Sequence, residues 1–197
     1  MSIDTRSVRV WDLPTRIFHW SLATAFLVAF VTSESEKLRD IHVIAGYSLA
    51  GLIGFRILWG FVGGAHSRFA DFLPTPGKVV DYLKSLLRGR PQHYVGHNPA
   101  GAVAIFLLLA FGLVAATSGY AAYNEIGGHF MEELHEAAAN GMMALVIIHV
   151  AGVIVSSWLH HENLVRAMIT GWKRPGPDQV SVETNVGIID VKRNGRN

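Results

Sequence analysis

The sequence contains no cysteine. This absence excludes disulfide bonds, thiolate metal sites, iron–sulfur clusters and covalent haem attachment through a CxxCH motif. Charged residues are also sparse, at 16% of the 197 residues, and the formal net charge is only +2. The basic residues form no stripe interleaved with aromatics, so we expect no nucleic-acid partner. Any metal must therefore be bound by histidine or oxygen ligands.

The hydrophobic residues, 50% of the chain, are concentrated in four long blocks. Each block is close to the roughly 20 residues that cross the hydrocarbon core of a bilayer. No cleavage motif of small residues ends the first block, so we interpret it as a retained span. The sequence predicts an all-α integral membrane protein, a four-transmembrane-helix bundle with spans at about residues 17–32, 41–62, 99–122 and 134–159.

Lysine and arginine are distributed unevenly over the connecting segments. Three precede the first span, five lie in residues 63–98 and six follow residue 161, against two in the first outer turn and none in the second. Because positive residues mark the cytoplasmic side, we expect both termini in the cytoplasm. Apolar residues recur at helical spacing beside basic ones over 76–88, which predicts a cytoplasmic amphipathic helix on the membrane surface.

The same pattern predicts the domain organisation. Residues 1–172 are expected to form one transmembrane domain. Residues 173–197 are polar and rich in proline, glycine and asparagine, which is typical of a weakly ordered tail. A short strand is expected within it, near residues 186–191.

Ten histidines are present, and most lie inside or at the ends of the apolar blocks. An ionisable side chain is costly there unless it has a function. By the predicted topology, His42 and His135 lie near the periplasm, and His19 and His149 lie nearer the cytoplasm. His135 and His149 are 14 residues apart, so in one helix they are separated by about 21 Å and point within roughly 40° of each other. That helix face can serve two sites.

Two imidazoles from different helices at one depth suit six-coordinate haem iron, because the porphyrin supplies the other four ligands. Zinc or copper would usually recruit three or four protein ligands at one level. We therefore predict two haem b groups, one bound by His42 and His135 and one by His19 and His149. The alternative is that each histidine forms a polar contact with another helix or relays protons. The presence of four histidines at two matched depths disfavours this alternative.

Three further residues are candidates for haem binding. Arg56 lies 14 residues after His42 and Arg16 one turn before His19, so either guanidinium is a candidate partner for a haem propionate. Snorkelling to the interface is the alternative for Arg56, and a topology-determining charge is the alternative for Arg16. Gly46, one turn after His42, would leave room for a flat macrocycle, although glycine is also common at membrane helix contacts.

Several motifs accompany these histidines: Val10-Trp-Asp-Leu-Pro-Thr-Arg-Ile-Phe-His19-Trp20, His42-Val-Ile-Ala-Gly46-Tyr47, Arg56-Ile-Leu-Trp59-Gly60, Ala65-His-Ser-Arg68-Phe and Gly96-His-Asn-Pro99-Ala-Gly101. Together with His135 and His149 they resemble the bacterial cytochrome b561 superfamily. The resemblance covers about residues 8–172. It is greatest to the di-haem cytochrome b subunits related to the b-type cytochrome anchor of nickel–iron hydrogenases.

This resemblance implies a respiratory electron-transport protein of the bacterial inner membrane. It would exchange electrons with ubiquinone or menaquinone and with a partner such as a c-type cytochrome or another redox protein. We thus predict an electron-transfer subunit with quinone oxidoreductase activity, surrounded by membrane lipid, with a homodimer as an open alternative. Candidates for handling quinone or its protons are Tyr47 or Glu133 outside and His97 or His160 inside.

Two other functions stay open at this point. A superoxide:quinone oxidoreductase would need a cationic funnel on the periplasmic face, where only Lys37 and Arg39 are available beside several acids. A non-redox membrane anchor or metal-ion transporter would group its histidines at one depth, whereas the predicted arrangement has two.

Overall fold

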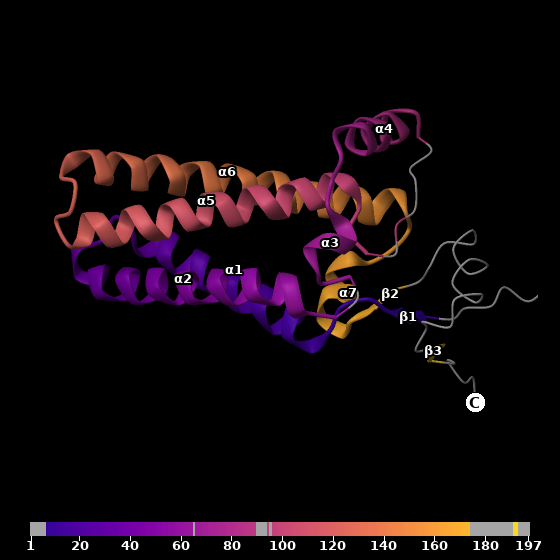
Figure 1. Cartoon of the computed structure of the whole chain (residues 1–197), viewed down its shortest axis with the longest axis horizontal. Coiled ribbons are helices and arrows are strands. Elements are labelled where there is room, and N and C mark those ends of the chain that lie inside the picture. The colour runs from indigo at the N-terminus through magenta and orange to yellow at the C-terminus, as the bar shows by residue number, and fades with distance from the viewer. Residues whose placement is uncertain (1–6, 65, 90–93, 95, 174–190, 193–197) are drawn as a thin grey trace, which may run out of the picture. The chain divides into compact units, whose positions relative to one another are not determined.

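The structure is a computed structural model, and it describes residues 7–64, 66–89, 94, 96–173 and 191–192. The elements, in chain order, are β1 (Ser7–Arg9), α1 (Leu13–Thr32), the 3-10 helix η1 (Glu36–Leu38), α2 (Arg39–Val62), α3 (Phe69–Phe72), α4 (Pro76–Leu87), α5 (Pro99–Tyr123), α6 (His129–Leu159), α7 (Leu164–Thr170), β2 (Trp172–Lys173) and β3 (Val191–Lys192) (Figure 1).

Four of these helices, α1, α2, α5 and α6, contain the four predicted spans. Each is long and apolar enough to cross a membrane, and no more than 22% of the residues in any of the four apolar stretches are buried within the protein. Many large apolar side chains on these helices are exposed, as expected for helices surrounded by lipid. The prediction of a four-helix transmembrane bundle is confirmed.

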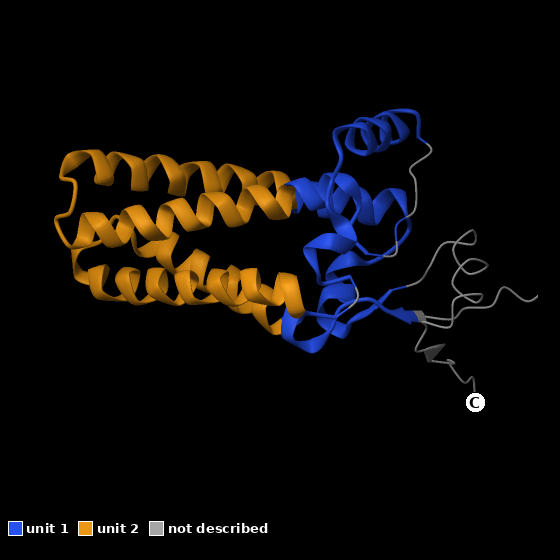
Figure 2. Ribbon diagram, viewed as in Figure 1, with its two compact units in different colours: residues 1–16, 63–103, 150–197 blue, residues 17–62, 104–149 orange. Residues whose placement is uncertain are grey.

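The chain divides into two compact units (Figure 2). Unit 1 comprises residues 1–16, 63–103 and 150–197, and unit 2 comprises residues 17–62 and 104–149. Unit 2 is the bundle proper, in which parts of α1, α2, α5 and α6 run side by side.

The centre of unit 2 is an apolar core to which all four helices contribute. Phe26, Leu49, Ile53 and Met142 are buried together. Close approach of the helices depends on glycine, since a Cβ on Gly112 would lie 2.7 Å from the Ile53 side chain. Small residues at membrane helix contacts allow such packing. The core therefore fixes how the four helices face one another.

Unit 1 contains a small sheet that the sequence did not predict. β1 is its central strand and pairs antiparallel with β2, Val8 opposite Lys173, and with β3, Val8 opposite Val191. Strands of two or three residues carry too short a pattern to recognise locally, and the partners are far away in sequence. Most of the predicted tail, residues 174–190 and 193–197, lies outside the described residues, as does most of the strand expected at 186–191.

The turn at Gly171 and an apolar contact with α7 hold the end of α7 beside the segment that follows β1. Gly171 ends α7 with φ of 86°, and a Cβ there would lie 2.7 Å from the Trp11 carbonyl oxygen. Only glycine meets both requirements without strain. Val10 and Trp11 are buried against Ala167 of α7, so this contact holds the segment before α1 against α7.

The predicted amphipathic helix of the 63–98 loop is present as α4. Pro76 occupies its first turn, where the missing N–H costs nothing. Tyr82 is its one buried residue, with 2% of its surface exposed. The helix therefore presents one side to the rest of unit 1 and leaves the others open.

Candidate haem-binding histidine pairs

The first pair of predicted ligands lies at one end of the unit 2 core. His42 comes from the first turn of α2 and His135 from the second turn of α6. Their ring centroids are 6.0 Å apart, with the ring planes at 87°, and both side chains are half-buried. A single metal ion bound about 2 Å from one nitrogen of each ring fits within this spacing.

The imidazole rings of His42 and His135 each form a hydrogen bond with a backbone carbonyl oxygen through Nδ1. His42 Nδ1 lies 2.8 Å from the Ala29 carbonyl oxygen of α1, and His135 Nδ1 lies 2.8 Å from the Ala115 carbonyl oxygen of α5. A carbonyl oxygen only accepts, so each Nδ1 must carry the proton and donate it. Each Nε2 then presents its lone pair. This tautomer can bind a metal ion through Nε2, while the hydrogen bond at Nδ1 orients the ring.

Neighbouring glycines admit the His135 ring and leave space beside His42. A Cβ on Gly119 would lie 2.8 Å from both Cε1 and Nδ1 of His135, so the imidazole occupies the position of the missing side chain. Gly46 is half-buried, and a Cβ there would meet nothing within 4 Å. The backbone at Gly46 thus leaves space one turn after His42, whereas the space at Gly119 is occupied by the His135 ring.

The second pair, His19 of α1 and His149 of α6, belongs to the other end of unit 2. Both side chains are half-buried, and they lie close enough to interact electrostatically. Nδ1 of His19 is buried, and no described residue forms a hydrogen bond with it. A buried polar atom without a partner is costly and points to a group that the protein atoms do not supply.

Fourteen residues of α6 and the apolar core separate the two pairs. Leu49, Ile53 and Met142 lie between the two levels along their helices. No described group of three or more histidine, aspartate or glutamate side chains is arranged to hold a metal ion. The histidines of the bundle thus occur as pairs, which is the donor set that a haem needs and that zinc rarely uses.

The two candidate arginines differ in burial, since Arg56 is buried and Arg16 is partly exposed. Arg56 is 3% exposed within unit 2, so its guanidinium is not at the protein surface. Arg16, in unit 1, donates from Nη2 to the Ile169 carbonyl oxygen, while its Nε is buried without a hydrogen-bond partner among the described residues. Each is suited to an anion of the propionate type.

The candidates for quinone and proton handling are divided between the two units. The Tyr47 ring of α2 is about half exposed and lies 6.4 Å from the Tyr120 ring. Glu133 is paired with Nε2 of His129 at 3.2 Å on an exposed surface.

The other two candidates belong to unit 1. His97 lies between aromatic rings, 4.5 Å from Trp11 and 4.4 Å from Phe72 by ring centroids. His160 directly follows α6 and is half-buried. His97 and His160 thus belong to unit 1, whereas Tyr47 and Glu133 belong to unit 2.

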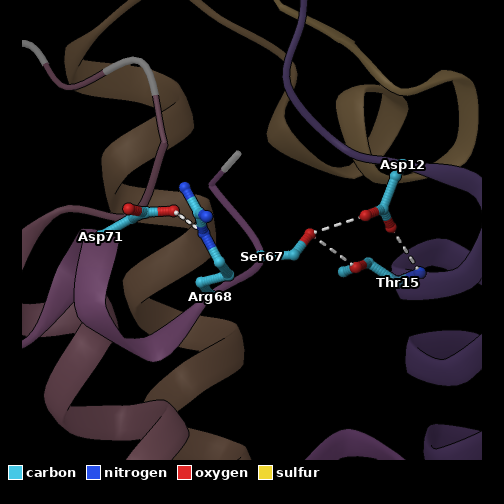
Figure 3. A network of polar contacts seen from close by, with 5 residues as sticks. All are labelled: Asp12, Thr15, Ser67, Arg68 and Asp71. Atoms are coloured by element: carbon cyan, nitrogen blue, oxygen red, sulfur yellow. Dashed lines mark hydrogen bonds and ion pairs between the residues drawn. The ribbon is translucent and has the colours of Figure 1, made fainter. Parts of the chain in front are cut away.

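A polar network in unit 1 was not anticipated from the sequence (Figure 3). Asp12 accepts from the Thr15 backbone N–H at 2.8 Å through Oδ1 and from the Ser67 hydroxyl at 2.9 Å through Oδ2. Because the one proton of Ser67 goes to Asp12, the Thr15 hydroxyl donates to Ser67, 2.9 Å away. Asp12 thus caps α1 and ties the motif around it to the motif that contains Ser67.

A four-helix membrane bundle with two pairs of histidines, one pair held by backbone carbonyls, is typical of a helical membrane cytochrome. The sequence profile described as prokaryotic cytochrome b561 matches residues 10–171. The chain therefore belongs to the prokaryotic cytochrome b561 family, and this membership implies haem b and electron transfer.

Similar sequences extend over most of the chain. It is similar to the probable Ni/Fe-hydrogenase B-type cytochrome subunit of Bradyrhizobium diazoefficiens, with 29% identity over 84% of this chain and 85% of that protein. The subunit of the same name from Azotobacter vinelandii is 27% identical over 85% and 88%. The probable Ni/Fe-hydrogenase 1 B-type cytochrome subunit of Escherichia coli K12 is 25% identical over 83% and 89%. No solved structure matches the chain.

Proposed function

We propose that this protein is a transmembrane di-haem b-type cytochrome that carries electrons between membrane quinone and a redox partner protein. The observation that supports it best is the occurrence of two histidine pairs in one four-helix unit, with one member of each pair on α6. Two haem sites, one above the other, would then share a single supporting helix.

The protein's part is to hold and orient the ligands. His42 and His135 would bind one haem, and His19 and His149 the other. When bound, each haem supplies a one-electron iron couple. The Ala29 and Ala115 carbonyls keep the Nδ1 protons in place, so that both Nε2 lone pairs face the site before any cofactor arrives. With two histidines as the protein ligands of each haem, substrates would exchange electrons without binding to iron.

We assign the binding of the negatively charged haem propionates to the two arginines. Arg56, buried in unit 2, and Arg16, with its unpaired Nε, would each bind a haem propionate. Quinone would bind beside one haem, where Tyr47 or Glu133 on one side, or His97 or His160 on the other, would exchange its protons. Tyr47 is the best placed of these for a substrate that arrives through lipid, because its ring is about half exposed on a membrane helix.

The names of the relatives and the charge distribution support a choice of partner and of compartment. Relatives named as Ni/Fe-hydrogenase cytochrome subunits favour a hydrogenase-like redox enzyme, with a c-type cytochrome as the alternative. Six basic residues after residue 161 and none in the turn between the last two spans favour the inner membrane with both termini cytoplasmic.

Haem stoichiometry tests the proposal directly. Detergent-purified protein should give two b haems per chain by pyridine haemochrome titration, and His42→Ala and His149→Ala should each lose one. His129→Ala is the matched control, because His129 is 79% exposed at the start of α6 and should keep both haems. Wild-type protein without haem, or variants that retain two, would disprove the assignment.

A further inference from the structure

Helix α4 exposes an apolar stripe that none of the described residues of unit 1 covers. Val80, Leu83 and Leu87 are 47%, 45% and 89% exposed. Their spacing of three and four residues places them in one row along the helix. Such a row exposed to water is unfavourable unless something apolar covers it.

The opposite flank of α4 is attached to the end of a membrane span. Tyr82 is buried, its ring lies 5.8 Å from that of Tyr94, and its hydroxyl forms a side-chain hydrogen bond with Ser156. Ser156 is three residues from the end of α6. With 31 residues, α6 is about 46 Å long and exceeds the roughly 30 Å hydrocarbon core, so this end lies near the head groups.

A basic row accompanies the stripe. Lys84 and Arg88 are four residues apart and lie roughly 90° around the helix from the apolar row, at about 100° per residue. Both residues are exposed, and within the described part of the chain neither side chain takes part in an ion pair. Asp81 is also exposed, and it lies further around the helix from the stripe than Lys84 and Arg88 do.

We propose that α4 is a binding surface for anionic phospholipid of the protein's own membrane. Val80, Leu83 and Leu87 insert at the level of the upper acyl chains, and Lys84 and Arg88 bind head-group phosphates. The apolar row, the adjacent basic row and the attachment to the end of α6 together favour a lipid surface over a protein partner, because an amphipathic helix with this arrangement lies in the membrane interface. This binding is independent of haem.

The absence of cysteine makes a site-specific test clean. Leu87→Cys and, as matched control, Asp81→Cys are labelled with an environment-sensitive fluorophore on the full-length protein. Both positions are exposed and lie on α4, so labelling should not disturb the fold. The labelled proteins are placed in nanodiscs of phosphatidylcholine, alone or with 30% phosphatidylglycerol, with and without head-group-proximal spin-labelled lipid.

We expect the Leu87 label to shift to shorter wavelength and to be quenched by the spin-labelled lipid, and the Asp81 label to remain unquenched. Phosphatidylglycerol should increase the Leu87 quenching, and Lys84→Gln with Arg88→Gln should abolish this increase, since each basic residue strengthens binding to an anionic surface about fivefold. Equal behaviour of the two labels would overturn the proposal and leave the stripe to a protein partner. Quenching that does not depend on phosphatidylglycerol would overturn the head-group assignment.

Discussion

At the scale of single residues, Gly119 decides where the His135 ring can lie. A Cβ would be 2.8 Å from two ring atoms, a distance that real contacts do not show, so Gly119→Ala must displace the imidazole from the Ala115 carbonyl. We predict that this variant loses the haem assigned to His42 and His135 and keeps the other. Pyridine haemochrome titration would show about one haem per chain.

The control for this substitution is Gly51→Ala. Gly51 lies in α2, is exposed, and a Cβ there would meet nothing within 4 Å. Alanine is favoured over glycine in a helix by up to about 1 kcal/mol, so the control should be neutral or slightly stabilising. Two haems in both variants would mean that the contact with Gly119 does not position His135.

The residue scale also separates what could be predicted from what could not. The pairing of His42 with His135 came from depth and helical spacing, and the structure brings these rings together; ligation itself stays a prediction. The Ala29 and Ala115 carbonyls could not have been anticipated, because a side chain that contacts a distant backbone leaves no pattern in the sequence. Gly119 was visible only as one small residue among many, since its role depends on the position of a ring on another helix.

At the scale of elements, Asp12 controls the start of α1. We predict that Asp12→Ala lowers the free energy of unfolding by about 2 kcal/mol, because the Thr15 N–H loses its cap and the buried Ser67 hydroxyl loses its acceptor. Thermal unfolding in detergent, followed by circular dichroism, should show a transition lowered by about 4–8 °C.

Asp71→Ala provides the comparison for Asp12. Its carboxylate pairs with Arg68 at 3.2 Å, but both side chains are partly exposed, so the pair should contribute little (Figure 3). If the two variants unfold at the same temperature, the network around Ser67 does not stabilise unit 1.

The buried Tyr82 phenol, which attaches α4 to the end of α6, should make the stability of the protein depend on pH. Burial raises the pKa of Tyr82 above its usual value of 10.0, and the nearby Tyr94 adds to the increase, while the hydrogen bond with Ser156 opposes it. Because the folded protein holds this proton more tightly than the unfolded chain, the contribution to stability is complete below pH 10. It is lost as the pH rises through the higher value in the folded state.

Absorbance at 295 nm measures this ionisation. The absorbance titration of the folded protein should contain a component that ionises late, and the Tyr82→Phe variant should lack this component. The variant should also lose less stability above pH 10 than the wild type does. Tyr94 should remain as a second late component, because burial and the neighbouring Asp81 raise the pKa of its phenol. A Tyr82→Phe titration identical to that of the wild type would show that Tyr82 ionises normally.

At the scale of the whole molecule, the bundle follows from composition alone, whereas unit 1 does not. Four apolar blocks of membrane-spanning length require four helices, since lipid offers no partner for backbone groups. The sheet around β1 depends on pairing between residues near the two ends of the chain. Such pairing arises from tertiary contacts that are individually too short to recognise.

Topology is the prediction that belongs to this scale. Single cysteines in place of Glu125, in the turn between α5 and α6, and of Asp81, in α4, should react with a membrane-impermeant maleimide from opposite sides of the membrane. We expect Glu125→Cys to be labelled in intact spheroplasts and Asp81→Cys only after permeabilisation, by the distribution of basic residues. The reverse pattern would invert the proposed orientation, and labelling of both from one side would contradict four spans.

The spacing of His135 and His149 on α6 has an electrical consequence. Fourteen residues place the two levels about 21 Å apart, which is about 0.7 of a 30 Å hydrocarbon core. An electron that moves between them would cross about that fraction of the membrane potential, a change of about 1.6 kcal/mol per 100 mV. A membrane potential of about 100 mV would then shift the distribution of the electron between the two histidine pairs more than tenfold. Electron transfer through the bundle would therefore depend on the membrane voltage.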